Sequence, residues 1–391
     1  MNYKLVSSTF DDKEIKSINE VIKSDMYSMG KNVSKFEDQC SKYFKSKYCV
    51  MVNSGSSANL IALSAAVLSE NIDINKGDEI IVTSLSWSTT YSPFYYLNLK
   101  PKYVDIDIET LNIDIKKIES SITRKTKAIF LVNITGNPNE FDEIKLIAKK
   151  NNLIIFEDNC ESMGAKYKKK YCGTFGLFGT MSTFFSHHMC TIEGGIVLTN
   201  NREFYETMLS IRAHGWTRNL PKNSIIHKKK GKDFDELFNF ILPGFNIRPI
   251  EFEGAIGQVQ LKKLGGFVKN RIRNSKIFYN TFKKYEDFIL QKQIEESSWF
   301  SFTIICKGKL ENKREQLIKF LNDNKIETRP ICGGDFTKSL AAKYLGGNYK
   351  TKMRNAEYVT KNGFFVGNTH KLLNNEIKYL KIKIDEFYKT I

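Results

Sequence analysis

Short apolar, β-branched runs alternate with amphipathic stretches through the first part of the chain. The runs cover residues 48–53, 79–83, 103–106, 127–132, 153–157, 182–185 and 195–199. Helix-like stretches lie between them, for example over residues 57–68 and 143–150. This alternation predicts a largely parallel sheet covered by helices on both faces. Such sheets bind their ligands at the carboxyl ends of the strands, so candidate functional residues are sought there.

The pattern changes near the Leu-Pro-Gly-Phe-Asn stretch at residues 242–246. A long helix-like segment follows over residues 251–282, then a strand over 299–306 and helices over 314–324 and 374–390. We therefore expect a large domain over residues 1–245 and a smaller α/β domain over residues 246–391. No internal repeat interrupts this arrangement.

Charge favours an anionic partner, because 60 basic and 43 acidic side chains give the 391-residue chain a net charge of +17. The densest basic run, His-Lys-Lys-Lys-Gly-Lys at residues 227–232, has no nucleic-acid-binding motif around it and is predicted to be a solvated loop. Nucleic-acid binding remains a weaker alternative. With neither an N-terminal apolar segment nor an uncharged run of membrane-spanning length, the chain is expected to be cytoplasmic and to have no membrane partner.

Cysteine spacing argues against a metal or cluster site. The seven cysteines include no C-x-x-C or C-x-C pair, which is the spacing typical of zinc and iron–sulfur ligands. We expect reduced thiols in a reducing compartment, and no metal.

A run of small polar residues, Asn-Ser-Gly-Ser-Ser-Ala-Asn at 53–59, follows one predicted strand and opens a helix. Backbone N–H groups at Gly55 and Ser56 can approach a phosphate closely there, and the helix N-terminus favours negative charge. The alternative is an ordinary capped helix start, with Ser56 or Ser57 as the N-cap.

An acid pair, Glu157 and Asp158, ends another predicted strand. A carboxylate from Asp158 at that edge would keep a pyridine nitrogen protonated and make the ring an electron sink. Alternatively, the two acids only cap the following helix.

Two histidines, His187 and His188, follow the strand that begins at Ser182 and precede a Glu-Gly-Gly turn at 193–195. Histidine titrates near neutral pH, so an imidazole at this sheet edge can both take and give a proton. Structural histidines that satisfy local hydrogen bonds are the alternative. Trp87, after a further strand, is a candidate to stack on a flat cofactor ring, unless it packs in the core.

In order and spacing, these clusters and the Gly-Phe-Asn-Ile-Arg stretch at 244–248 resemble the DegT/DnrJ/EryC1/StrS family of sugar aminotransferases. The resemblance covers nearly the whole chain. It implies the three-layer α/β fold of fold-type I pyridoxal phosphate enzymes, which is like that of aspartate aminotransferase. It also implies a homodimer with shared active sites.

One position departs from the aminotransferase pattern. Five residues after the phosphate-binding serine these enzymes carry the lysine that bonds to the cofactor, whereas five residues after Ser182 this sequence has His187. Together with Trp87 and with Glu161, where aminotransferases usually have Gln, this is similar to the family's 3-dehydratases of GDP-linked 4-keto-6-deoxy sugars. A second dehydratase branch acts on CDP-sugars with an iron–sulfur cluster, but the cysteine spacing it needs is absent.

The resemblance implies a role for each candidate residue. Pyridoxal phosphate would be converted by L-glutamate to pyridoxamine phosphate, with release of 2-oxoglutarate. Its phosphate would lie on Gly55, Ser56 and Ser182, with Asn246 reaching in from a second subunit, while Asp158 and Trp87 hold the ring and Glu161 orients ligands. His187 would be the acid/base in loss of the C3 hydroxyl, which leaves a 3-deoxy sugar and ammonia for surface polysaccharide synthesis. Substrate contacts are expected from His188, His214, Arg248 and Arg329.

Two alternatives stay open at this point. A nucleotide-sugar aminotransferase would need a lysine from elsewhere, for example from residues 168–170. A non-catalytic protein with the same fold would need none of the proton-transfer residues. Whether the sugar is a hexose or a heptose is also open.

Overall fold

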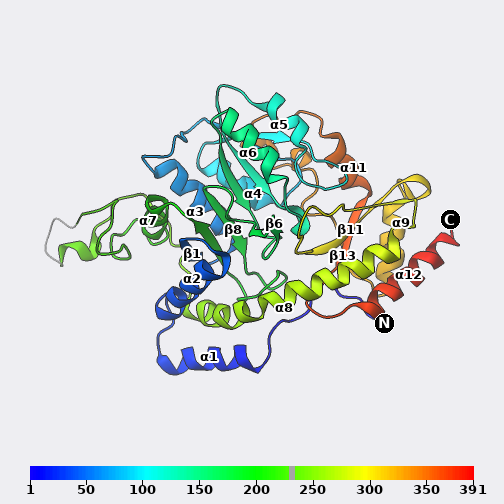
Figure 1. The fold of residues 1–391 in the computed structure, drawn as a ribbon, viewed down its shortest axis with the longest axis horizontal. Coiled ribbons are helices and arrows are strands. Elements are labelled where there is room, and N and C mark those ends of the chain that lie inside the picture. Colours follow the sequence, from blue (N-terminus) through cyan, green and yellow to red (C-terminus); the bar gives the residue numbers. More distant parts are fainter. Residues whose placement is uncertain (229–233) are drawn as a thin grey trace.

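The computed structural model describes residues 1–228 and 234–391, and a seven-stranded sheet lies at its centre (Figure 1). Its strand order is β1-β9-β8-β5-β4-β2-β3. Strand β9 is antiparallel to both of its neighbours, and the other pairs are parallel, as the alternating pattern predicted. The strands are β1 (Tyr48–Val52), β2 (Glu79–Thr83), β3 (Lys100–Val104), β4 (Thr126–Val132), β5 (Ile154–Asp158), β8 (Phe178–Ser182) and β9 (Gly195–Thr199).

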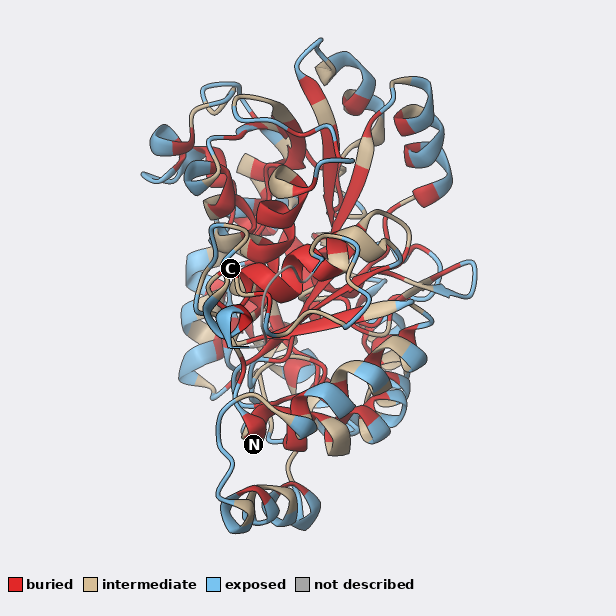
Figure 2. Ribbon diagram, turned by 90° about the vertical axis from the view of Figure 1, so that its left-hand side faces the viewer, coloured by how far each residue is buried: buried red, intermediate tan, exposed pale blue. Residues whose placement is uncertain are grey.

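Helices cover both faces of this sheet because its strands alternate their apolar side chains. Ile80 and Val82 pack into one core with helices α3, α4 and α7, whereas Ile81 packs on the opposite face with α5 and α6. Helices α2 and α8 cover the β1–β9–β8 side of that second face. Buried positions gather in the middle layer (Figure 2). The helices are α2 (Lys31–Phe44), α3 (Gly55–Leu68), α4 (Ser88–Tyr96), α5 (Ile115–Ser121), α6 (Phe141–Lys150), α7 (Arg202–Ile211) and α8 (Glu251–Phe282).

A second, antiparallel sheet has the order β10-β11-β13-β12 and its own apolar core. Helices α9 and α12 pack on it. The strands are β10 (Phe288–Leu290), β11 (Ser301–Cys306), β12 (Thr328–Arg329) and β13 (Gly363–Gly367), and the two helices are α9 (Arg314–Asp323) and α12 (Asn374–Tyr388). Helices α10 (Ala342–Leu345) and α11 (Arg354–Asn362) come from the same part of the chain but pack into the core of the large sheet. The remaining elements are α1 (Asp12–Ser24), the hairpin β6 (Lys166–Tyr167) and β7 (Lys170–Tyr171), and the 3-10 turns η1 (Ile134–Gly136), η2 (Asp235–Phe238), η3 (Gly308–Leu310) and η4 (Phe336–Lys338).

Helix α8 belongs to both cores. Leu261 and Leu264 pack under the large sheet, whereas Phe278 and Phe282 pack in the core of the second sheet, and Figure 1 shows the helix running between the two. Tyr3, from the other end of the chain, also packs in the second core. The domain division after residue 245 stays a prediction.

Two predicted strands differ from the structure. The strand predicted over residues 182–185 is wrong, because β8 ends at Ser182 and the following chain forms turns in which Phe184 and Phe185 are exposed. Their apolar character mimics a strand, although they line a pocket instead. Strand β3 begins earlier than predicted, at Lys100, because it is an edge strand whose lysines alternate with apolar residues.

Part of the predicted basic loop, residues 229–232, lies outside the described residues. Within the described part, His227 Nε2 lies 2.9 Å from Glu236 Oε2. No helix of the described residues is long and apolar enough to cross a membrane.

Candidate active site

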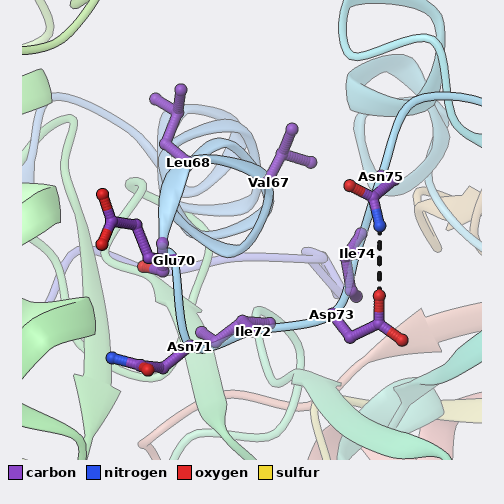
Figure 3. A pocket seen from close by; sticks show the side chains of 9 residues that line it. Val67, Leu68, Glu70, Asn71, Ile72, Asp73, Ile74 and Asn75 are labelled. Atoms are coloured by element: carbon purple, nitrogen blue, oxygen red, sulfur yellow. Dashed lines mark hydrogen bonds between the residues drawn. The ribbon is translucent and has the colours of Figure 1, made fainter.

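Two hollows are found at opposite ends of α3. At its C-terminal end, residues 67–75 enclose about 420 Å³ within one continuous stretch of chain (Figure 3). The other, of about 750 Å³, lies at the start of α3 and is lined by residues from both sheets. The second is the candidate site, since it lies at the carboxyl ends of β5 and β8, as predicted. It brings together Gly55, Ser56, Trp87, Asp158, Glu161, Ser182, His187 and Arg329.

The N-terminus of α3 forms one wall of this pocket. The N-cap is Ser54, not Ser56 or Ser57, and its Oγ accepts from Ser57 N at 3.0 Å. A Cβ at Gly55 would lie 2.6 Å from the Cβ of Ser182, so only glycine fits between the helix and β8. The helix N-terminus and the hydroxyls of Ser56 and Ser182 therefore share one small, polar recess.

Asp158 is held rigidly at the end of β5. Its Oδ2 accepts hydrogen bonds of 2.8 Å from Asn59 Nδ2 and Thr90 Oγ1, and its Oδ1 accepts one of 3.0 Å from Cys160 N. The side chain is buried, and these donors suit a charged carboxylate. Asn59 and Thr90 received no role from the sequence. Asn59 could have been found from the sequence, because it is a polar residue among the apolar residues of α3.

The two acids at the end of β5 point in different directions. Glu157 is buried on the other side of the strand, where it accepts backbone hydrogen bonds from Gly173, Phe175 and Gly176. Burial raises the pKa of Glu157 to about 7. Only Asp158 of the pair faces the pocket.

Glu161 lines the pocket just after β5 and contacts Cys332, which follows β12. Its Oε2 accepts from Thr135 N at 3.0 Å, and Cys332 Sγ lies 3.4 Å from the same oxygen. Burial raises the pKa of Glu161 above its ordinary value. Cys332 was missed because it lies far from Glu161 along the chain, and no spacing in the sequence links the two residues.

His187 lines the pocket with a half-buried imidazole. Its ring centroid lies 5.3 Å from that of Phe300, and its Nδ1 lies 3.5 Å from Ser186 Oγ. Burial, and then the positive charge of Arg271, lower the pKa of His187 to about 4. The imidazole is therefore neutral near pH 7 and able to accept a proton.

Trp87 and Arg329 also reach the pocket. Trp87 precedes α4 and is 60% exposed, so the core-packing alternative does not describe it. Arg329 on β12 donates from Nη1 to its neighbour's carbonyl, Thr328 O, at 3.0 Å.

The other predicted residues do not line this pocket in the same chain. His188 is fully buried, and its Nε2 donates to Ser298 O at 3.2 Å. His214, Asn246 and Arg248 gather around Trp216 instead. The His214 ring lies 5.0 Å from that of Trp216, and the Arg248 guanidinium lies 6.0 Å from the same indole. Arg248 Nε also donates to Asn246 Oδ1 at 3.0 Å.

No lysine is among the described residues that line the pocket. Lys168 is exposed and pairs with Asp142, and Lys170 Nζ lies 4.7 Å from the Phe175 ring centroid, so neither lines it. Within residues 1–228 and 234–391, no group of three or more His, Cys, Asp or Glu side chains is arranged to hold a metal ion.

Comparison with known proteins gives consistent similarities. The family model for the DegT/DnrJ/EryC1/StrS aminotransferase family matches residues 8–384. The chain is 49% identical, over 97% of its length and 99% of the relative, to a GDP-4-keto-6-deoxy-D-mannose 3-dehydratase of Escherichia coli O55:H7. Two solved structures match with a TM-score of 0.95 and 49% identity over 98% of this chain. One is the E. coli GDP-4-keto-6-deoxy-D-mannose-3-dehydratase with bound hydrated PLP, matched over 99% of its chain. The other is a GDP-4-keto-6-deoxymannose-3-dehydratase with a trapped PLP-glutamate geminal diamine, matched over 100% of its chain.

Proposed function

This chain belongs to the DegT/DnrJ/EryC1/StrS aminotransferase family, and from that premise we propose that it is a 3-dehydratase of a GDP-linked 4-keto-6-deoxy sugar. The observation that carries this proposal is the pocket itself, which presents His187 and, among the described residues, no lysine. An aminotransferase needs a lysine there to bond to pyridoxal phosphate. A histidine offers proton transfer without that bond.

The pocket fits the phosphorylated pyridine cofactor of this family. The start of α3 packs so closely on β8 that a Cβ at Gly55 would collide with Ser182, and the helix N-terminus and the hydroxyls of Ser56 and Ser182, which line the pocket together, suit the phosphate. Asp158, fixed by its donors, suits a protonated ring nitrogen, and the exposed indole of Trp87 suits a flat ring. When bound as pyridoxamine phosphate, the cofactor supplies a primary amine for the C4 ketone and a ring that withdraws electrons.

His187 moves the proton in the proposed reaction. Because its Nδ1 faces Ser186 Oγ, Nε2 is the nitrogen left for proton transfer. Nε2 takes a proton from the carbon that carries the amine and delivers it to the C3 oxygen of the sugar as that oxygen leaves as water. A lowered pKa keeps the imidazole in its basic form before the first transfer.

L-Glutamate is the reductant. Its amino group restores the amine form of the cofactor and leaves as ammonia, while its carbon skeleton becomes 2-oxoglutarate, so the sugar loses one oxygen per glutamate consumed. The guanidinium of Arg329, which lines the pocket, suits a carboxylate or diphosphate. Glu161 accepts from Thr135 N and contacts Cys332 Sγ, and its carboxyl group would help to orient the bound glutamate or sugar.

A homodimer would complete the site. His214, Asn246 and Arg248 gather around Trp216 away from their own pocket, beside the exposed rings of Phe238 and Phe240. Large exposed apolar rings next to polar, ligand-binding side chains are typical of an interface. In the proposed dimer this cluster faces the pocket of the other subunit, where Asn246 contacts the phosphate. The role in surface polysaccharide synthesis and the cytoplasmic location stay predictions.

Ammonia release tests the proposal. The protein is given pyridoxal phosphate, L-glutamate and a panel of GDP-4-keto sugars, and ammonia, 2-oxoglutarate and sugar products are measured. We expect equal amounts of ammonia and 2-oxoglutarate, a 3-deoxy product, and a cofactor that borohydride does not fix to the chain. An amino sugar formed without ammonia would instead establish an aminotransferase.

A lysine at the histidine position gives a second test. His187→Lys should abolish C3 deoxygenation and allow borohydride to fix the cofactor to the chain. His370→Lys is the matched control, since His370 lies outside the pocket, and it should behave as wild type. A wild-type protein that neither releases ammonia nor makes amino sugar would be the non-catalytic alternative.

A further inference from the structure

Residues 298–300 lead into β11 and carry the Phe300 ring to the pocket. That ring packs against the imidazole of His187, with the centroids 5.3 Å apart and the planes inclined by 55°. The polar contact of the same imidazole, at 3.5 Å from Ser186 Oγ, is at the long limit for a hydrogen bond. The Phe184 ring also packs edge-on against this imidazole, with the centroids 5.9 Å apart, but it is exposed, whereas Phe300 is the nearer ring. Aromatic packing therefore orients His187, and the position of Phe300 matters for it.

Three buried side chains hold residues 298–300, one at each successive carbonyl. His188 Nε2 donates to the first carbonyl at 3.2 Å, Asn368 Nδ2 to the second at 2.8 Å, and Arg271 Nη1 to the third at 2.9 Å. Their exposed fractions are 0%, 1% and 4%. These donors come from three different parts of the chain, so the segment is fixed on more than one side.

The amide groups of the segment are bound to the turn η1. Ser298 N donates to Gly136 O and Phe300 N to Thr135 O, each at 2.9 Å. Gly136 approaches so closely that a Cβ there would lie 2.6 Å from Trp299 N. Trp299 itself has φ +51°, a conformation that costs energy for a residue with a side chain and persists only where its surroundings enforce it.

The charge of Arg271 acts on the same place. Its described partners are carbonyl oxygens, and no described carboxylate pairs with it. Burial and then the charge of Arg271 lower the pKa of His187, and burial, followed by Arg271 and His187, lowers the pKa of His188. The buried guanidinium thus both ties down the segment and opposes a positive charge on His187.

We propose that His188, Asn368 and Arg271 are positioning residues for His187: they fix residues 298–300 and thereby the Phe300 ring that holds the imidazole at the pocket. His188 then acts behind its neighbour and does not touch the substrate. Naming His187 as the base rests on the proposed function, but its orientation by Phe300 does not.

The test removes one donor and restores it. His188→Phe keeps an aromatic ring without the donor, and His188→Gln restores an N–H. His370→Phe is the control, because His370 also feels Arg271 but binds none of the three carbonyls. In the full chain, with and without cofactor, the rate at which diethyl pyrocarbonate modifies His187 is followed against pH by peptide mass. Ammonia release gives kcat and KM.

Water that enters beside a loosened Phe300 should return the pKa of His187 toward about 6.5 in His188→Phe. The neutral fraction, and with it the modification rate at pH 5.5, then falls roughly tenfold. We expect kcat to fall roughly tenfold to a hundredfold with little change in KM, as a small misplacement of a reacting group does. His188→Gln should restore most of both values, and His370→Phe should alter neither.

A purely structural role gives a different result. If His188→Phe lowers kcat or thermal stability while the pH profile of His187 modification stays in place, the proposal is overturned. Should that variant fail to fold, Phe300→Leu, which leaves all three backbone hydrogen bonds intact, must shift the same profile, and an unmoved profile overturns the proposal equally. Because the modification needs no substrate, it separates this proposal from a failure of the dehydratase assignment.

Discussion

Gly55→Ala should separate cofactor binding from fold stability. The new Cβ would lie 2.6 Å from the Cβ of Ser182 and 3.1 Å from Cys160 Sγ, far inside ordinary contact distances. The Ser182 atom cannot rotate away, because a Cβ is fixed by the backbone of β8. The start of α3 must therefore move away from Ser182, and the recess proposed for the phosphate is distorted.

The expected magnitudes follow from this collision. Overpacking of this kind costs about 1–3 kcal/mol of stability. A hydrogen bond to a charged group is worth about 1.5–3 kcal/mol, so loss of one phosphate contact weakens binding roughly tenfold to 150-fold. Cofactor affinity should therefore fall by at least an order of magnitude, while the protein stays folded.

The assay is a titration with pyridoxal phosphate followed by absorbance, together with thermal unfolding. Gly266→Ala is the matched control: it lies on the exposed side of α8, no atom lies within 4 Å of its added Cβ, and alanine favours a helix by about 0.5–1 kcal/mol. We expect unchanged or higher stability and unchanged affinity there. Wild-type affinity in Gly55→Ala would refute the assignment of the recess to the phosphate.

Three further outcomes are expected. Burial raises the pKa of Glu157 to about 7, so the folded chain holds this proton more tightly than the unfolded chain does. The contribution of Glu157 to stability is therefore fully present below about pH 4.5 and falls by about 3 kcal/mol as pH rises to 7. In Glu157→Gln, the melting temperature should fall less steeply between pH 4.5 and 7, and the remaining slope should include the similar contribution of Glu253. If the slope is the same as in the wild type, burial of Glu157 is not its cause. Gly367→Ala would place a Cβ 2.4 Å from Lys4 O, so it should lower stability by about 1–3 kcal/mol and loosen the N-terminal segment to proteolysis. If active sites are shared, mixed dimers of inactive His187→Asn and Asn246→Asp chains should regain activity that neither has alone, and no regain would indicate sites built within one chain.

Local patterns predicted the residues that follow strands. Asp158 was predicted because parallel strands place their carboxyl ends together, whereas Ser182 and His187 received their roles from the order and spacing of the family's motifs. The polarity of a strand end and the spacing of a motif are properties of short segments, and the sequence carries them directly.

Residues that meet although they lie far apart along the chain could not be predicted in this way. Phe300 and Cys332 reach the pocket from the second sheet, more than a hundred residues from the groups they contact. Their side chains have no distinctive spacing, and which of them lines the pocket depends on how the two cores pack. For the same reason the sequence assigned His188 to the substrate, since its actual partner, the carbonyl of Ser298, lies far along the chain.

The single helix α8 has a mechanical consequence. At 1.5 Å per residue its 32 residues span about 48 Å, with one half embedded in each core. The helix resists any change in the angle between the two cores, because such a change would bend a continuous hydrogen-bonded helix. The pocket is lined by the exposed side chains of Trp87 and Phe185 and by Leu5 near the N-terminus. We therefore expect the two apolar cores to keep their relative position during turnover.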